Sequence, residues 1–183
     1  MQALPRDFYN RNTIQVAHEL LGKFLVHHFN GEDRIGKIVE VEAYLGPQDL
    51  AAHTSKGLTP RTRAMFGPPG HAYVYLIYGM HHGMNVVTEP EGTGTAVLLR
   101  ALEPVANLPV SASGPGRLCK AMGIDKGHYG HDLCSPTLFI ADNPDPAPIR
   151  IVERPRIGVD YAGEWAAKPL RFYIEGSPYI SRK

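Results

Sequence analysis

An Asn-Gly pair at residues 30–31 is the feature that most restricts how this chain can fold. It separates two segments rich in apolar and β-branched residues, KFLVHHF at 23–29 and RIGKIVEVEAY at 34–44. Asn-Gly readily adopts the left-handed backbone of a tight hairpin turn, and such a pair between apolar segments is the strongest short-range hairpin signal. The sequence therefore predicts two antiparallel strands within residues 23–44.

Further β-rich segments along the chain predict a largely antiparallel sheet. Strands are expected at residues 71–79 and 84–89, on either side of a Gly-bounded turn, and at 95–104, where Pro104 should end the strand. Near the C-terminus, residues 154–176 should supply another strand, a turn or short helix, and a final strand.

Short helices are expected beside this sheet. Residues 12–22 have the apolar periodicity of an amphipathic helix, with Asn12 or Thr13 as its N-cap. Pro115 and Gly123 bracket a second short helix, since proline favours the first helical turn and glycine the end. Residues 50–70 should form a loop with a short helical piece at most, and DNPDPAP at 142–148 a connector. The expected class is α+β.

The length of 183 residues suits one domain, spanning residues 1–183, with 16 prolines and 19 glycines favouring turns over a helical bundle. No apolar segment approaches the roughly 18 residues of a membrane helix, and the N-terminal residues lack the apolar core of a secretion signal. We therefore expect an intracellular protein, in the cytoplasm or nucleoid if bacterial and in the nucleus if eukaryotic. Cys119 and Cys134 lack zinc-like spacing and should be reduced packing residues.

The second strand of the predicted hairpin carries two carboxylates on one face. Strict alternation assigns Ile38, Glu40, Glu42 and Tyr44 to that face. Residues two apart on a strand lie about 6.6 Å apart, a separation at which paired carboxylates can cleave a glycosidic bond through an activated water. Two acids at this spacing also occur on an exposed, solvated strand face. The spacing alone leaves both interpretations open.

Closely spaced histidines raise the hypothesis of a metal site. The pairs are His27 with His28, His81 with His82, and His128 with His131. Adjacent histidines on a strand point to opposite faces, and the chain has neither an HExxH motif nor a Cys/His quartet. We expect neither a bound metal nor a cofactor.

Positive charge is concentrated in one part of a nearly neutral chain. No carboxylate occurs between Asp49 and Glu89, whereas Lys56, Arg61, Arg63 and four histidines do. Such local positive potential suits an anionic partner such as a nucleic-acid backbone. Chance clustering in a neutral protein is the alternative.

Five segments, in order from about residue 14 to 181, resemble the alkyladenine DNA glycosylase family, also called the methylpurine DNA glycosylase family. They are KIVEVEAYLGPQDLAAH, TPRTRAMFGPPGHAYVYLIYGMHHGMNVV, AVLLRALEP, GPGRLCKAMGI and RIGVDYAGEWAAKPLRFYIEGSPYIS. The resemblance implies one compact domain with a curved, mainly antiparallel sheet, flanking short helices and a protruding hairpin. It also implies an enzyme that flips alkylated or deaminated purines out of duplex DNA and hydrolyses the glycosylic bond without a cofactor. Such purines include 3-methyladenine, 7-methylguanine, hypoxanthine and ethenoadenine.

The resemblance also implies roles for residues around the reacting base. Glu42 would be the general base that activates water, and Arg100 would help to hold Glu42. Tyr44 would stack on one face of the flipped purine. His53 and Tyr75 would contact the opposite face of the purine. Neutral purines would need a second proton source, for which Glu40 is only a weak candidate.

Asn85 would line the pocket and help to exclude guanine. Tyr78 would be the wedge that fills the vacated base stack, with Met80 beside it. Arg61 and Arg63 would contact the DNA backbone; simple solvation of the two arginines is the alternative. The partner implied is duplex DNA with damaged purines, bound by a monomer. A non-catalytic nucleic-acid-binding module on the same sheet is the alternative, and a histidine-based metallohydrolase is a third.

Overall fold

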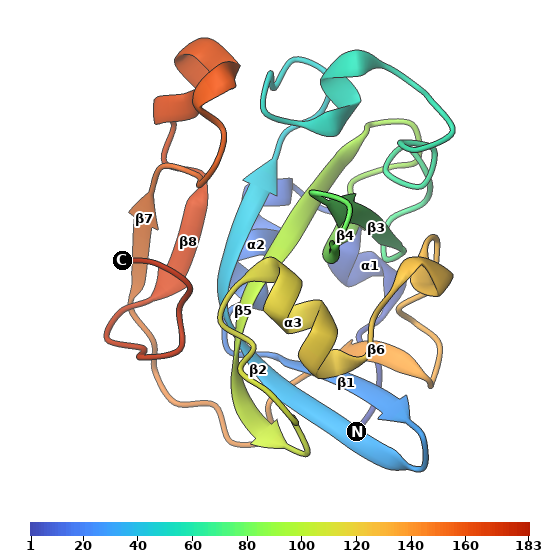
Figure 1. The fold of residues 1–183 in the computed structure, drawn as a ribbon, viewed down its shortest axis with the longest axis vertical. Helices are drawn as coiled ribbons and strands as arrows, with labels where there is room; N and C mark the ends of the chain where they lie inside the picture. The colour runs from blue at the N-terminus through green and yellow to red at the C-terminus, as the bar shows by residue number, and fades with distance from the viewer.

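The computed structural model describes residues 1–183, and its eight strands form one sheet in which every pair is antiparallel (Figure 1). The strands are β1 Phe24–Phe29, β2 Glu32–Tyr44, β3 Ala72–Ile77, β4 His81–Thr88, β5 Thr95–Ala106, β6 Leu138–Ala141, β7 Ile151–Arg154 and β8 Arg171–Ile174. The main path runs β3-β4-β5-β2-β1-β6, and β8 pairs with both β2 and β7. The predicted α+β class with a curved antiparallel sheet is confirmed.

The long strand β2 is the centre of this sheet. Asn30 and Gly31, with φ of 48° and 83°, form the predicted turn from β1 into β2. The first part of β2 pairs with β1, residues 40–42 pair with β8, and β5 pairs along the other edge. The part of β2 that carries Glu40 and Glu42 therefore lies between two strands and is covered on both edges.

Two irregularities interrupt the pairing of β2 with β5 beside these carboxylates. Ile38 pairs with Leu102 and Glu40 with Ala101, so Val39 has no partner, and Arg100 is skipped in the same way on β5. Such bulges re-aim side chains and are common next to active sites. They also break the alternation, so the assignment of Ile38 to the face of Glu40 was wrong. Ile38 packs in the main core instead.

Short helices cover the sheet, with α3 in front of β5 and α2 behind the strands in the view of Figure 1. The helices are α1 Arg6–Tyr9, α2 Thr13–Leu20, η1 His53–Lys56, α3 Pro115–Met122, η2 Lys126–His128 and η3 Asp160–Ala167. Asn12 caps α2 by accepting from the backbone N–H groups of Ile14 and Gln15, and Pro115 begins α3. Both predicted helices are confirmed, as is the short helical piece at η1 within the loop before β3.

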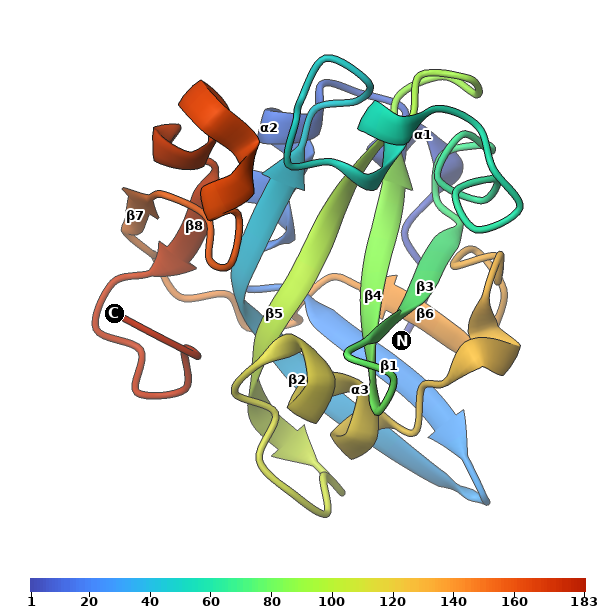
Figure 2. The same cartoon turned by 45° about the horizontal axis from the view of Figure 1, so that its top comes forward.

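The main core joins the inner faces of α2 and α3 to the strands between them. Leu20 of α2, Leu118 and Met122 of α3, and Leu99 of β5 are fully buried in one cluster. Figure 2 shows the β3–β4 hairpin at the edge of the sheet, with its turn beside α3. The exposed side chains of Tyr78 and Met80 at this turn agree with the protruding hairpin expected from the sequence. Every helix falls short of the length and apolar character that a membrane span requires.

Several boundaries differ from the sequence prediction. Strand β5 continues through Pro104 to Ala106. Pro104 is exposed and pairs with Gly36 next to a register shift, a position at which the strand needs no backbone N–H for pairing, so a proline can be accommodated. The hairpin turn is tighter than expected and lies at residues 78–80, since His81 already pairs with Ile77. Strand β7 lies at Ile151–Arg154, before most of the segment expected to contain it, and β6 and α1 were not predicted.

Candidate active site

A cavity of about 340 Å³ opens where β2, β3, β4 and β5 meet η1, the N-terminus of α3 and the loop before η3. It is lined by Tyr44, Ala51, His53, Met65, Tyr73, Tyr75, Ile77, Tyr78, Asn85, Leu98, Arg100, Pro115, Ile157, Gly158, Val159 and Tyr161. Six of the residues singled out in the sequence are thus brought together from β2, η1, the β3–β4 hairpin and β5. The wall is mainly aromatic and apolar, as ligand pockets usually are.

Glu42 lies directly behind the wall of this cavity and is fully buried. Its Oε2 accepts a hydrogen bond of 2.7 Å from the Tyr44 hydroxyl, and its Oε1 accepts one of 2.8 Å from the backbone N–H of Ile157. The Nη1 of Arg100 lies 3.4 Å from the same Oε1. All three partners line the cavity, so the carboxylate is held rigidly just behind its wall.

These contacts leave the carboxylate able to act on a further group. A carboxylate has about four acceptor positions, and three donors approach Glu42. One position remains for a donor such as a water molecule. A buried, oriented carboxylate with a free acceptor position has the geometry of a general base.

Glu40 is also fully buried, which overturns the interpretation of the two acids as an exposed strand face. The Nε of Arg100 donates to Glu40 Oε1 at 3.1 Å, and Nη1 of Arg171 donates to the same oxygen at 3.3 Å. Arg100 therefore bridges both carboxylates and separates two like charges. Neither carboxylate is part of the cavity lining, but all three partners of Glu42 line the cavity, whereas Arg100 is the one partner of Glu40 that does. The candidacy of Glu40 as a second proton source therefore gains no support.

Aromatic rings in contact with one another form part of the cavity wall. The ring centroids of His53 and Tyr75 lie 4.6 Å apart in an edge-to-face arrangement, and Nδ1 of His53 shares a hydrogen bond of 2.9 Å with the Tyr73 hydroxyl. Burial raises the pKa of Tyr73 to about 12 and, together with the nearby Glu42, raises that of Tyr44 well above its usual value. These tyrosines are therefore neutral hydrogen-bond donors at physiological pH.

The imidazole of His53 is also neutral at physiological pH. Burial, with a smaller contribution from the Arg61 charge, lowers the pKa of His53 from 6.5 to about 4. The unfolded chain therefore takes up a proton between pH 6.5 and 4 that the folded chain does not. Stability should fall as the pH falls through this window.

We expect His53→Gln to lose part of this pH dependence. In urea unfolding between pH 7 and pH 4, the free energy of unfolding of the wild type should decrease more steeply than that of the variant, because only the wild type buries a neutral imidazole. Parallel curves for the two proteins would contradict the lowered pKa.

Asn85 of β4 lies in the wall of the cavity. It is buried, and its Nδ2 donates to the carbonyl oxygen of Tyr73 at 3.3 Å. This bond fixes the orientation of the amide. The residue therefore presents a polar group at a defined place in a mostly apolar wall.

The β3–β4 turn presents two large apolar side chains to solvent. Tyr78 is 96% exposed and Met80 79% exposed, yet Tyr78 also lines the mouth of the cavity, whereas Met80 does not. Tyr78 and Gly79 have φ values of 50° and 71°, the left-handed backbone of a tight hairpin turn. A tyrosine in this conformation is strained, and such strain clusters at functional sites.

The two arginines of the loop before β3 lie in different places. Arg61 lines a second hollow that shares His53 and Tyr161 with the cavity, and its guanidinium lies 5.6 Å from the ring centre of Tyr75. Arg63 lies in a separate groove beside Tyr129. Both are exposed, but only Arg61 is adjacent to the cavity.

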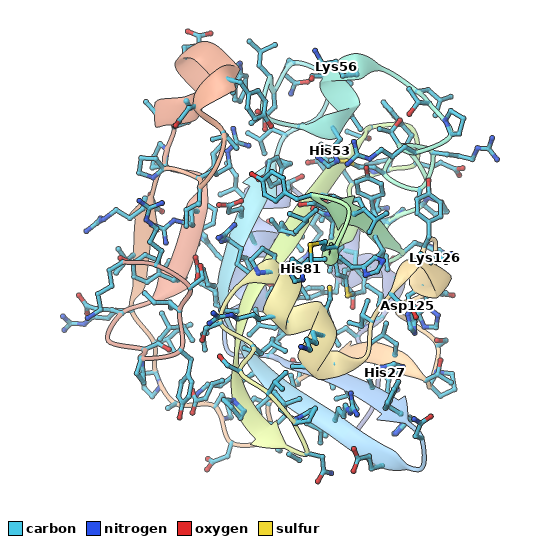
Figure 3. The ribbon with its side chains drawn as sticks, viewed as in Figure 1. His27, His53, Lys56, His81, Asp125 and Lys126 are labelled. Carbon is cyan, nitrogen blue, oxygen red and sulfur yellow. The ribbon has the colours of Figure 1, made fainter.

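Figure 3 shows how two of the histidines lie relative to this region. His53 lies on η1 near Lys56, and His81 lies lower, beside the N-terminal end of α3. A Cβ at Gly116 of α3 would come within 2.9 Å of the His81 side chain, so the helix packs closely against the hairpin. The structure brings no three potential metal-ligating side chains into one group.

The sequence reasoning did not single out an ion pair that supports the cavity wall. Arg156 donates from Nη1 to Asp49 Oδ2 at 2.6 Å and from Nη2 to Oδ1 at 2.9 Å, with both side chains fully buried. The guanidinium also lies 4.8 Å from the ring centre of Tyr44. The only available signal was the position of Arg156 just before Ile157 in a segment that resembles the family.

Comparison of the sequence with a family model and with known proteins points to one enzyme family. The family model described as methylpurine-DNA glycosylase matches residues 7–178. A protein of Legionella pneumophila strain Corby is 61% identical over 182 residues, covering 100% of both chains, and is named "Putative 3-methyladenine DNA glycosylase". A protein of the same name from Myxococcus xanthus is 55% identical over 185 residues, covering 100% of this chain and 95% of the relative.

Proposed function

Because the chain belongs to the methylpurine-DNA glycosylase family, we propose that it removes damaged purines from duplex DNA by hydrolysing the bond between base and deoxyribose. One observation carries this proposal: a buried Glu42 is held by three donors that all line an aromatic cavity. The cavity mouth carries the exposed Tyr78. This combination provides a base for water, stacking surfaces for a purine and a group that can enter a base stack.

In the proposed reaction, Glu42 takes a proton from the water at its free acceptor position. The water oxygen forms a bond to C1′ of the flipped nucleotide, and the bond from C1′ to the purine nitrogen breaks, with its electron pair leaving on the purine. The negative charge of Glu42 stabilises the oxocarbenium-like transition state. Arg100 and the Ile157 N–H keep the carboxylate aimed at this position. The products are a free base and an abasic site.

The aromatic wall supports alkylated purines as substrates. A purine such as 3-methyladenine is a cation in DNA, so it is attracted to aromatic faces and leaves readily without a strong acid. Tyr44 would stack on one face, and His53 with Tyr75 on the other. We propose the same pocket for 7-methylguanine, hypoxanthine and ethenoadenine. The fixed amide of Asn85 would crowd the exocyclic amine of guanine, and 7-methylguanine, which carries the same amine, would be released because its positive charge makes it a better leaving group.

Tyr78 is proposed as the wedge for base flipping. Extruding a base costs a few kcal/mol, least at damaged sites, and an inserted side chain can fill the gap in the stack. The 96% exposure of the Tyr78 ring and its place at the cavity mouth support this role. Met80 would contact the neighbouring bases.

Replacing Tyr78 with asparagine should change stability and activity in opposite directions. Asparagine tolerates the left-handed backbone at φ 50° better than tyrosine does, so the variant should gain about 1 kcal/mol in free energy of unfolding. Loss of the ring should weaken binding to lesion-containing duplex about tenfold. Tyr78→Phe, which keeps the ring, serves as the control in both measurements. A Tyr78→Asn protein that binds and excises normally would exclude the wedge.

The loop arginines complete the proposed DNA face. Arg61, next to the cavity, would hold the phosphates of the strand that carries the lesion, and Arg63 would contact the backbone further away. One chain supplies the entire cavity wall, so we propose that the protein acts as a monomer. The relatives are bacterial proteins, and the bacterial nucleoid is the proposed place of action.

A panel of duplexes tests the substrate range. Each duplex would carry one hypoxanthine, ethenoadenine or 7-methylguanine, and a matched duplex would carry guanine or adenine at the same position. We expect single-turnover release of the damaged bases and none of the normal ones. Hypoxanthine is guanine without the exocyclic amine, so equal release of guanine and hypoxanthine would contradict the proposed role of Asn85.

A further inference from the structure

The C-terminal tail after β8 reaches the back of the active site. It folds back beside β7 and β8 (Figure 1), and the half-buried Ser181 contacts the carboxylate network behind the cavity. The Ser181 hydroxyl donates to Glu40 Oε1 at 2.8 Å, and its backbone N–H donates to Oε2 of the same residue. Nη2 of Arg100 donates to this hydroxyl at 3.2 Å.

Each nitrogen of the Arg100 guanidinium thus has its own partner. Nε contacts Glu40, Nη2 contacts Ser181 and Nη1 contacts Glu42. A guanidinium is a rigid planar fork, so three separate partners define both its position and its plane. Without the Ser181 contact, two carboxylates compete for one cation, and the fork can rotate toward Glu40.

The tail is anchored on both sides of Ser181. The Ser113 hydroxyl donates to the carbonyl oxygen of Tyr179 at 2.6 Å, and Nη1 of Arg171 donates to that of Arg182 at 2.8 Å. Arg171 also donates to Glu40. The position of the Ser181 hydroxyl is therefore fixed by contacts to three other parts of the fold.

We propose that Ser181 is a positioning residue for base excision, which holds Arg100 so that its Nη1 faces Glu42. It acts through Arg100 and has no contact with the cavity itself, since it is not among the residues that line it. This inference rests on the proposed function, because it assumes that Glu42 is the base.

Three variants test the inference. Ser181→Ala removes the hydroxyl, and Ser181→Thr keeps it. Ser177→Ala is the matched control, since the Ser177 hydroxyl lies in the same tail and accepts only from the backbone N–H of Tyr179. For each protein, the single-turnover rate of hypoxanthine release at saturating enzyme, the affinity for an abasic-site duplex and the thermal unfolding midpoint would be measured.

We expect Ser181→Ala to release base about tenfold more slowly, the effect of losing one hydrogen bond to charged groups. Its affinity for DNA should be unchanged, and its unfolding midpoint should fall by a few degrees, because the same hydrogen bond also stabilises the folded chain. Ser181→Thr should recover the wild-type rate, and Ser177→Ala should behave as wild type. A wild-type rate in Ser181→Ala, or a loss that Thr does not rescue, would overturn the inference. A wild-type protein that releases no base would overturn the proposed function, and the inference with it.

Discussion

Replacing Glu42 with glutamine should reduce base release by about 10²- to 10⁴-fold, the usual contribution of a general base. The amide has nearly the shape of the carboxylate, and its oxygen can still accept from Tyr44 or from the Ile157 N–H. It cannot take a proton from water, and it supplies no negative charge to an oxocarbenium-like transition state. Binding to lesion or abasic DNA should remain, because no stacking or phosphate contact is removed.

The matched control for this variant is Glu103→Gln. Glu103 is also a carboxylate of the sheet, but it forms a surface ion pair of 2.7 Å with Lys37, away from the cavity. The same change of charge there should leave the single-turnover rate at the wild-type value, since surface pairs contribute little. Substantial excision by Glu42→Gln would show that another group activates the water.

Of the substitutions described, Asp49→Ala should lower the free energy of unfolding the most. The change leaves Arg156 as a buried charge without a counterion, and removing one partner of a buried pair costs about 3–5 kcal/mol. It also removes the acceptor of the Leu45 and Ala51 N–H groups. We expect a loss of this size in the free energy of unfolding, measured by urea titration.

Asp145→Ala is the comparison for this measurement. Asp145 is exposed in the connector and has no ion-pair partner, so its replacement should change the free energy of unfolding by less than about 0.5 kcal/mol. An Asp49→Ala protein that is as stable as Asp145→Ala would show that the buried pair does not support the wall of the cavity.

Much of the fold could be predicted from local sequence signals. The Asn30-Gly31 turn, the Asn12 cap and the Pro115 start of α3 are each determined by residues within a few positions of one another. Local chemistry restricts the backbone there regardless of the tertiary structure, and these elements lie where the sequence predicts them.

The errors arose where pairing between distant strands decides the geometry. The bulges at Val39 and Arg100 depend on how β2 and β5 pair, and nothing near Ile38 indicates that alternation fails there. The turn after β3 tightened for the same reason, because residues 81–83 pair with β3 rather than extending the loop.

Part of the candidate site could not be predicted from the sequence either. The partners Asp49 and Arg156 are 107 residues apart in the chain, and Ser181 is 141 residues from Glu40. No periodicity or motif links such residues, so they become visible only in the folded structure. Glu42 itself is different, since its spacing from Glu40 on one predicted strand marks it as a candidate in the sequence alone.

The central claim is that the protein hydrolyses the bond between a damaged purine and its sugar. The most direct measurement is the amount of free hypoxanthine released from a duplex with a single hypoxanthine, compared with the number of abasic sites formed in the same DNA. We expect the two amounts to be equal and the DNA strand to remain uncut. A protein that binds this duplex and leaves every base attached would instead be a DNA-binding module, and that result would contradict the claim.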